Sequence, residues 1–250
     1  MKSKIEWLRN PITGEAGYTI NPVKGLCPVD CKDNQGKSYC YARRMYKRFK
    51  WEEEIRWDDS VWWHGLLGKV GDRYFIGSTM ELFGDWIEDW WMTTIFEWVR
   101  NYPQRTFILL TKQPQNLSKW SPFPDNCWVG VSVCNDKMLD TAVDKLEDIQ
   151  AKIKFISFEP LLSRLTLSLD YAFYYAGISW VICGAQTPHS EKTMPKIEWI
   201  TSIVETASKA GIPIFLKNNL ESLIHHEWQD NVYAKLLRTP SGKLRQELPQ

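Results

Sequence analysis

The sequence predicts an α/β fold on a parallel sheet, namely a partial or full (β/α) barrel of the TIM type with about six or seven strands. Two observations predict it. After residue 70, apolar runs of strand length alternate with segments of helical pattern. These runs are almost continuously hydrophobic, which is typical of strands buried on both faces of a parallel sheet. A doubly wound open sheet is the alternative.

The candidate strands are apolar runs bounded by polar or turn residues. A short one covers 18–22, directly before the first cysteine. The others are Arg73–Ser78, Thr106–Thr111, Trp128–Val133, Lys154–Phe158, Trp180–Gly184 and Ile212–Lys217. Helices are expected between several of them, over 86–99, 136–151 and 195–210. Because functional groups of such folds gather at the carboxyl ends of the strands, the polar residues there are candidate site residues.

The chain is expected to form one domain. No repeat or long linker divides its 250 residues, of which 44% are hydrophobic. The polar segment from about residue 239 is expected to be a flexible tail. No apolar run approaches the roughly 18–20 residues that span a membrane, and the first residues do not have the pattern of a signal peptide. We therefore expect a cytoplasmic protein without a membrane partner.

Three cysteines cluster directly after the first candidate strand. Cys27, Cys31 and Cys40 would lie on the first loop at the carboxyl end of a barrel. Three soft thiolates suit an iron–sulfur cluster with one iron left open. There are two alternatives. The cysteines could hold zinc together with a distant fourth ligand, or they could bind no metal. The remaining cysteines lie at or inside strand runs and are interpreted as ordinary buried residues: Cys127, Cys134 and Cys183.

The cysteine segment resembles the signature of the radical S-adenosylmethionine (SAM) enzymes, Cys-x3-Cys-x2-Cys with an aromatic residue before the third cysteine. Cys27 and Cys31 have the spacing of its first half, and Tyr39-Cys40 matches its end. Eight residues separate Cys31 from Cys40 where the signature has two. The additional residues 33–38 are polar and turn-like, and a loop absorbs such an insertion at small entropic cost.

Most of the chain is also similar to a phage-associated, radical-SAM-like family of unknown function. The resemblance rests on short motifs that recur in order: Ile5-Glu6-Trp7, Asn21-Pro22-Val23, Cys40-Tyr41-Ala42-Arg43-Arg44-Met45, Gly77-Ser78, Leu82-Phe83-Gly84-Asp85-Trp86, Leu109-Leu110-Thr111-Lys112, Val129-Gly130-Val131-Ser132-Val133 and Ile156-Ser157-Phe158-Glu159-Pro160-Leu161-Leu162. One motif in the later part of the chain differs from that of the family. The family has Gly-Gly-Glu-Ser-Gly where this chain reads Gly184-Ala185-Gln186-Thr187-Pro188.

The resemblance implies a barrel of the radical SAM kind and a [4Fe–4S] cluster on the three cysteines. With an electron from an external donor, the cluster would cleave SAM to methionine and a 5′-deoxyadenosyl radical, which would take hydrogen from an unknown substrate. Mapped by order, the SAM-binding groups would be the Tyr39 backbone, Gly77, Ser78, Thr79, Ser132 and Asn135. Lys112 and Glu159 end neighbouring strands and are candidate catalytic residues. They could pair with each other, contact SAM or hold substrate, and a structural ion pair is the other interpretation.

A basic, aromatic stretch follows the third cysteine. Residues 41–51 contain Arg43, Arg44, Lys47, Arg48 and Lys50 among Tyr41, Tyr46, Phe49 and Trp51. Such a pattern could contact nucleic-acid phosphates and bases. The alternative is a solvated amphipathic helix balanced by residues 52–54, which are all glutamate. The competing hypothesis for the whole protein is a non-catalytic binding protein that holds zinc or a structural cluster, with nucleic acid as a conceivable partner.

Overall fold

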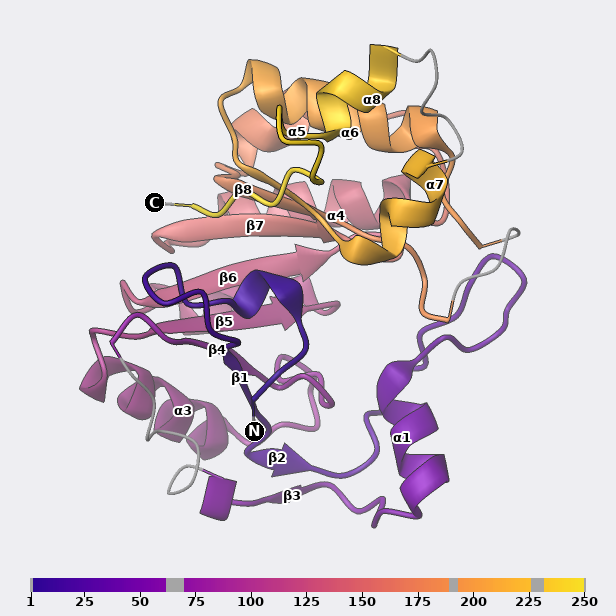
Figure 1. The fold of residues 1–250 in the computed structure, drawn as a ribbon. Helices are drawn as coiled ribbons and strands as arrows, with labels where there is room; N and C mark the ends of the chain where they lie inside the picture. The colour runs from indigo at the N-terminus through magenta and orange to yellow at the C-terminus, as the bar shows by residue number, and fades with distance from the viewer. Residues whose placement is uncertain (1, 62–69, 189–192, 226–231, 250) are drawn as a thin grey trace. The chain divides into compact units, whose positions relative to one another are not determined.

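The computed structural model describes residues 2–61, 70–188, 193–225 and 232–249. The fold is α/β, and the main sheet of the described residues has seven strands in the order β1-β4-β5-β6-β7-β8-β9 (Figure 1). The strand pairs at both ends of this order are parallel. The prediction of an α/β fold with six or seven parallel strands is therefore confirmed.

The strands of the main sheet match the apolar runs of the sequence closely. Their bounds are β1 Tyr18–Ile20, β4 Arg73–Ile76, β5 Thr106–Thr111, β6 Cys127–Ser132, β7 Ile153–Phe158, β8 Trp180–Cys183 and β9 Ile214–Leu216. A second, antiparallel sheet consists of β2 Val23–Lys24 and β3 Arg56–Trp57. The described α-helices are α1 Tyr41–Phe49, α3 Asp89–Asn101, α4 Asp136–Glu147, α5 Leu169–Tyr175, α6 Ile197–Lys209, α7 Glu221–His225 and α8 Val232–Leu237.

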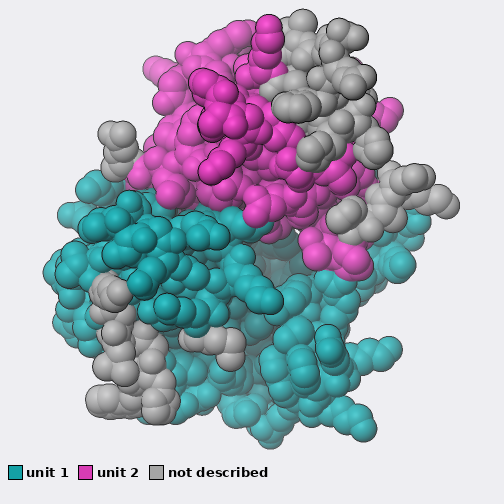
Figure 2. Space-filling model, in the orientation of Figure 1, with its two compact units in different colours: residues 1–130, 150–152 teal, residues 131–149, 153–250 magenta. Residues whose placement is uncertain are grey.

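The chain divides into two compact units (Figure 2). The first contains residues 1–130 and 150–152. In it β4 pairs with β1 and β5, and all four residues of β4 are buried. The rings of Tyr18, Tyr74 and Phe107 stack across these three strands, with centroid distances of 5.0 and 5.4 Å. This continuous apolar packing explains why the strands read as unbroken hydrophobic runs.

The second unit contains residues 131–149 and 153–250. Its strands β7, β8 and β9 are parallel neighbours. On the helical side, α4 packs against α5 and α5 packs against α6. α6 buries the apolar stripe predicted for 195–210, including Ile200, Ile203 and Val204. The single domain expected from the sequence stays a prediction, since each unit has a core of its own.

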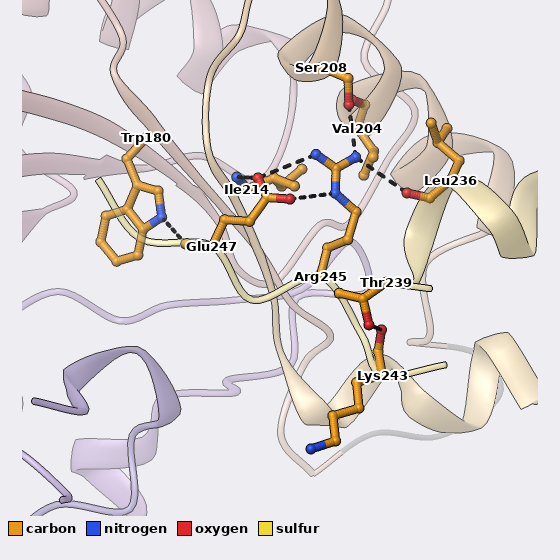
Figure 3. A network of polar contacts seen from close by, with 9 residues as sticks. All are labelled: Trp180, Val204, Ser208, Ile214, Leu236, Thr239, Lys243, Arg245 and Glu247. Carbon is orange, nitrogen blue, oxygen red and sulfur yellow. Dashed lines mark hydrogen bonds and ion pairs between the residues drawn. The ribbon is translucent and has the colours of Figure 1, made fainter. Parts of the chain in front are cut away.

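The polar segment from residue 239 is hydrogen-bonded to other parts of the second unit (Figure 3). The Arg245 guanidinium donates to the Glu247 carboxylate at 2.7 and 3.3 Å and to Ser208 Oγ at 2.8 Å. Glu247 also accepts from the Ile214 N–H at 3.1 Å, and its carbonyl accepts from Trp180 Nε1 at 3.0 Å. The side chains of this segment therefore fasten it to β8, β9 and α6.

None of the helices within the described ranges is both long and apolar enough to cross a lipid bilayer.

Candidate functional site

The cysteine loop begins in the first unit immediately after β2. The Cys27 thiol is buried and accepts hydrogen bonds from the backbone N–H groups of Glu81 and Val29. Burial raises the pKa of the Cys27 thiol, and the negative charges of Glu81 and Cys40 add to this effect. Cys27 is therefore held from two sides, by its own loop and by the segment that follows β4.

The eight residues between Cys31 and Cys40 fold back on themselves. The Tyr39 N–H donates to the Cys31 carbonyl at 2.9 Å, and Lys32 and Ser38 form an antiparallel bridge. At the tip, the Asp33 carboxylate accepts from the N–H groups of Gln35 and Lys37 at 2.9 and 3.0 Å. This is an Asx-type turn, favoured by the polar composition of the insertion. The expectation that the insertion leaves Cys31 and Cys40 close in space is confirmed.

Cys31 and Cys40 form a hydrogen-bonded thiol pair. The bond to Cys40 raises the pKa of Cys31, and the same bond lowers the pKa of Cys40. The backbone N–H groups of Ala42 and Arg43 at the start of α1 also lower the pKa of Cys40. A helix N-terminus favours a thiolate. Cys40 is thus the thiol of the pair that loses its proton more readily.

Arg43 ties the loop together. Its guanidinium donates to the carbonyl oxygens of Cys27 and Pro28 at 3.1 and 3.4 Å. It also pairs with the Asp30 carboxylate, at 3.5 Å from Nε to Oδ1. One side chain on α1 therefore binds the loop that carries the other two cysteines, and its positive charge lowers the pKa of Cys40 further.

Glu81 is a candidate site residue that the sequence analysis missed. Its carboxylate is buried and accepts from the Thr111 hydroxyl at 2.6 Å, from the Lys112 N–H at 2.7 Å and from the Phe83 N–H at 3.1 Å. Burial raises its pKa. The available signal was a single carboxylate inside the apolar run Met80–Phe83, directly after a strand. Glu81 links the end of β5 to the segment that contacts Cys27.

Replacing Glu81 by Ala is expected to lower the free energy of unfolding by about 3 kcal/mol, because each buried donor left without its acceptor costs ~1–3 kcal/mol. Glu81→Gln retains one acceptor oxygen and should cost less. Glu97→Ala, on the exposed face of α3, serves as the control and should change stability little. Urea denaturation measures all three. A loss for Glu81→Ala no larger than that for Glu97→Ala would contradict this role.

The segment after β4 places Gly77, Ser78 and Thr79 beside Asn21. The Ser78 hydroxyl and the Thr79 N–H both donate to Asn21 Oδ1, at 3.1 and 3.0 Å. Gly77 has φ +80°, and a Cβ atom there would lie 2.7 Å from the Leu82 side chain. These residues form a tight turn that directs the chain to Glu81. Their contact with the amino group of SAM stays a prediction.

Lys112 also belongs to the first unit. Its positive charge lowers the pKa of Cys31, although the hydrogen bond to Cys40 and burial outweigh it. Its N–H donates to Glu81. Tyr39 is oriented by its backbone bond to Cys31. The structure therefore brings together Cys27, Cys31 and Cys40 with Lys112 and Glu81 around them.

Three predicted site residues belong to the second unit. Ser132 is buried at the end of β6. Asn135 caps α4, since its side-chain oxygen accepts from the Met138 N–H at 3.0 Å. Glu159 forms an ion pair with Lys217 on the segment after β9, and both side chains are largely shielded from solvent. Of the alternatives left open for Glu159, a structural ion pair is observed, but its partner is Lys217.

The remaining cysteines behave as expected for ordinary core residues. Cys127, Cys134 and Cys183 are buried and do not form disulfide bonds. Burial raises the pKa of Cys127 and Cys183, which leaves their thiols protonated. No interaction described above connects these three cysteines to the loop that carries Cys27, Cys31 and Cys40.

The donor set of the loop fits an iron–sulfur cluster by its chemistry. It consists of three soft thiols, backbone N–H groups directed at two of the sulfurs, and the nearby cations Arg43 and Lys112. Across the described ranges, no group of three or more His, Cys, Asp or Glu side chains is arranged to hold a single metal ion. To receive a cluster, Cys31 and Cys40 would exchange their mutual hydrogen bond for bonds to iron.

Comparison with known proteins gives one result. A family model described as a protein of unknown function (DUF5131) matches residues 2–244. No curated protein and no solved structure matches the chain.

Proposed function

The chain belongs to the DUF5131 family, whose function is unknown, and from its own residues we propose that it is a radical-SAM-like iron–sulfur enzyme. Cys27, Cys31 and Cys40 would hold a [4Fe–4S] cluster, and SAM would be the second cofactor. When bound, the cluster supplies the electron that cleaves SAM, with an external reductant as its source and an unknown substrate as the hydrogen donor. A relationship to the radical SAM enzymes, including their kind of barrel and the phage association of the similar family, is part of this proposal.

One observation carries the proposal. The insertion that separates Cys31 from Cys40 closes into a turn of its own, so the two thiols meet although eight residues lie between them. Cys27 is coupled electrostatically to both. Three thiols from one loop are the ligand set that leaves one iron open for SAM.

The protein's own residues would orient the cofactors. Arg43 fixes the loop by its bonds to Cys27 and Pro28. The turn Gly77–Thr79, Ser132 and Asn135 are the proposed SAM contacts. Lys112 and Glu159 are proposed to bind substrate or SAM. Glu159 would share its carboxylate between this ligand and its ion pair with Lys217. None of the six cysteines forms a disulfide bond, which supports a reducing, cytoplasmic location.

A non-catalytic binding protein that holds zinc or a structural cluster is the second candidate. The segment Gly184–Pro188 supports it, because the carboxylate and two glycines of the similar family are replaced there. Only the first candidate binds SAM through its cluster and forms 5′-deoxyadenosine from it.

After anaerobic reconstitution, the protein is expected to bind SAM much more tightly than the metal-free form, since chelation by the open iron adds to the polar contacts. With SAM and dithionite it should release 5′-deoxyadenosine slowly, even without substrate. Ser132→Ala should weaken SAM binding without loss of iron, whereas Ser202→Ala, on the exposed face of α6, should not. Calorimetry and chromatography measure these quantities. Equal SAM affinity with and without the cluster, or no nucleoside after reduction, would favour the second candidate.

A further inference from the structure

The helix that follows the cysteine loop has a basic outer face. α1 turns Ala42 and Tyr46 inward, where both are buried. At helical spacing, the opposite side carries Tyr41, Arg44, Lys47 and Arg48, and all four are exposed. The face ends in Phe49 and, after Lys50, in Trp51. We refer to Tyr41, Arg44, Lys47, Arg48, Phe49 and Trp51 as the α1 face.

Aromatic rings stand among the cations of this face. Tyr41, Phe49 and Trp51 are 56%, 49% and 44% exposed. The rings of Phe49 and Trp51 stack with centroids 5.4 Å apart, and the Arg48 guanidinium lies 5.3 Å from the Phe49 centroid. Exposed, ordered rings beside guanidinium groups provide surfaces on which other planar groups can stack.

Positive charge is concentrated on and around the α1 face. Residues 43–50 contain five cations and no carboxylate. Of the three following glutamates, Glu52 is paired with Arg56 at 3.0 Å. Among the ion pairs of the described residues, none engages Lys47 or Arg48. Among the described residues, Lys47 and Arg48 therefore keep their charges available to a partner.

The α1 face is also held rigidly. The Tyr46 hydroxyl accepts from the Gly25 N–H at 2.8 Å, and Trp51 packs edge-on against the Tyr46 ring at 5.2 Å. Lys50 adopts the left-handed conformation that ends the helix. The rings and cations are therefore preorganised, which lowers the entropic cost of binding a partner.

We propose that the α1 face binds single-stranded nucleic acid. The cations would contact successive phosphates, and Tyr41 and Phe49 would stack with bases that a duplex keeps covered. Single-stranded nucleic acid combines negatively charged phosphates with exposed planar bases. The cations of the α1 face complement the phosphates, and its rings complement the bases. The inference names a partner for the protein and does not depend on the cluster, so metal-free protein should bind equally well.

Fluorescence anisotropy with a labelled oligothymidine of about 20 nucleotides tests the proposal, because such binding sites cover ~4–16 nucleotides. With three phosphates contacted, by Arg44, Lys47 and Arg48, log K should fall with log salt at a slope of about −2. Lys47→Glu/Arg48→Glu should weaken binding at least about tenfold and flatten this slope. Lys152→Glu/Lys209→Glu, an equal charge change at exposed positions of the chain, is the matched control and should alter binding little.

Stacking is tested separately. Tyr41→Ala and Phe49→Ala should each weaken binding at least about fivefold. Tyr174→Ala removes another exposed ring, 81% exposed, from α5, whose seven residues include no Lys or Arg, and should have no effect. Circular dichroism shows that each variant folds. Duplex bound as tightly as the single strand, ring variants that bind normally, or stronger binding to phosphatidylserine vesicles than to the oligonucleotide would each overturn the proposal.

Discussion

Protein in which Cys27, Cys31 or Cys40 is replaced by Ala is expected to hold no iron–sulfur cluster, whereas the unaltered chain should hold about four irons and four sulfides after anaerobic reconstitution. The reason lies in the geometry of the loop. Cys31 and Cys40 form a thiol pair, and Cys27 is electrostatically coupled to both. Each variant keeps only two of the three thiols, so the cluster lacks one of its three protein ligands. Iron and sulfide analysis, with absorption near 400 nm, measures the loss.

The chain offers matched controls for this experiment. Cys127→Ala, Cys134→Ala and Cys183→Ala remove buried thiols and should leave the iron content unchanged. Deletion of residues 33–38 joins Lys32 to Tyr39 and gives the short spacing of the radical SAM signature. Because Lys32 and Ser38 already pair across the base of the turn, cluster assembly should survive the deletion. Stoichiometric zinc without an iron-dependent spectrum would contradict the assignment.

Gly25→Ala is expected to destabilise the first unit strongly. Gly25 has φ +111°, which side chains rarely adopt, and a Cβ atom there would lie 2.5 Å from the Glu54 carbonyl oxygen and 2.6 Å from the Ile55 Cα. Backbone cannot move aside as a flexible side chain does. The substitution should therefore lower the free energy of unfolding by more than about 3 kcal/mol or displace the cysteine loop.

Gly36→Ala separates the two causes of that effect. Gly36 has φ +76°, but nothing lies within 4 Å of a Cβ atom at this position. Gly36→Ala should lower the free energy of unfolding by about 1–2 kcal/mol, which is the cost of the left-handed conformation alone. Chemical denaturation gives both values, and thiol accessibility reports the position of the loop. Equal losses at the two glycines would show that the predicted collision at Gly25 is relieved without cost.

The fold of the main sheet was predictable because each of its strands is a hydrophobic run of the right length. The runs at Thr106–Thr111 and Lys154–Phe158 differ from β5 and β7 by no more than one residue at either end. Cys27, Cys31 and Cys40 were identified as candidate ligands from spacing and residue type, and their role as cluster ligands stays a prediction. Asn135 was correctly placed at a strand end, but the sequence did not show that its oxygen is used to cap α4.

The missed features depend on long-range contacts. Glu81 is recognisable as a site residue only when Thr111 and Lys112, about 30 residues later, are seen to surround its carboxylate. The partner of Glu159 could not be predicted either, since Lys217 lies 58 residues away along the chain. The short sheet of β2 and β3 was missed because two-residue strands have no detectable periodicity.

The C-terminal segment has a consequence for solubility. β9 ends the strand order of the main sheet, and such an edge offers unpaired amides on which another molecule can add a strand. Here the Leu216 N–H donates to the Arg245 carbonyl and the Glu247 N–H donates to the Ile214 carbonyl, both at 2.8 Å. The segment around Arg245 therefore occupies the edge, and the bonds of Glu247 to the Ile214 N–H and of Arg245 to Ser208 Oγ hold it there. By covering β9, it protects the chain against edge-to-edge aggregation.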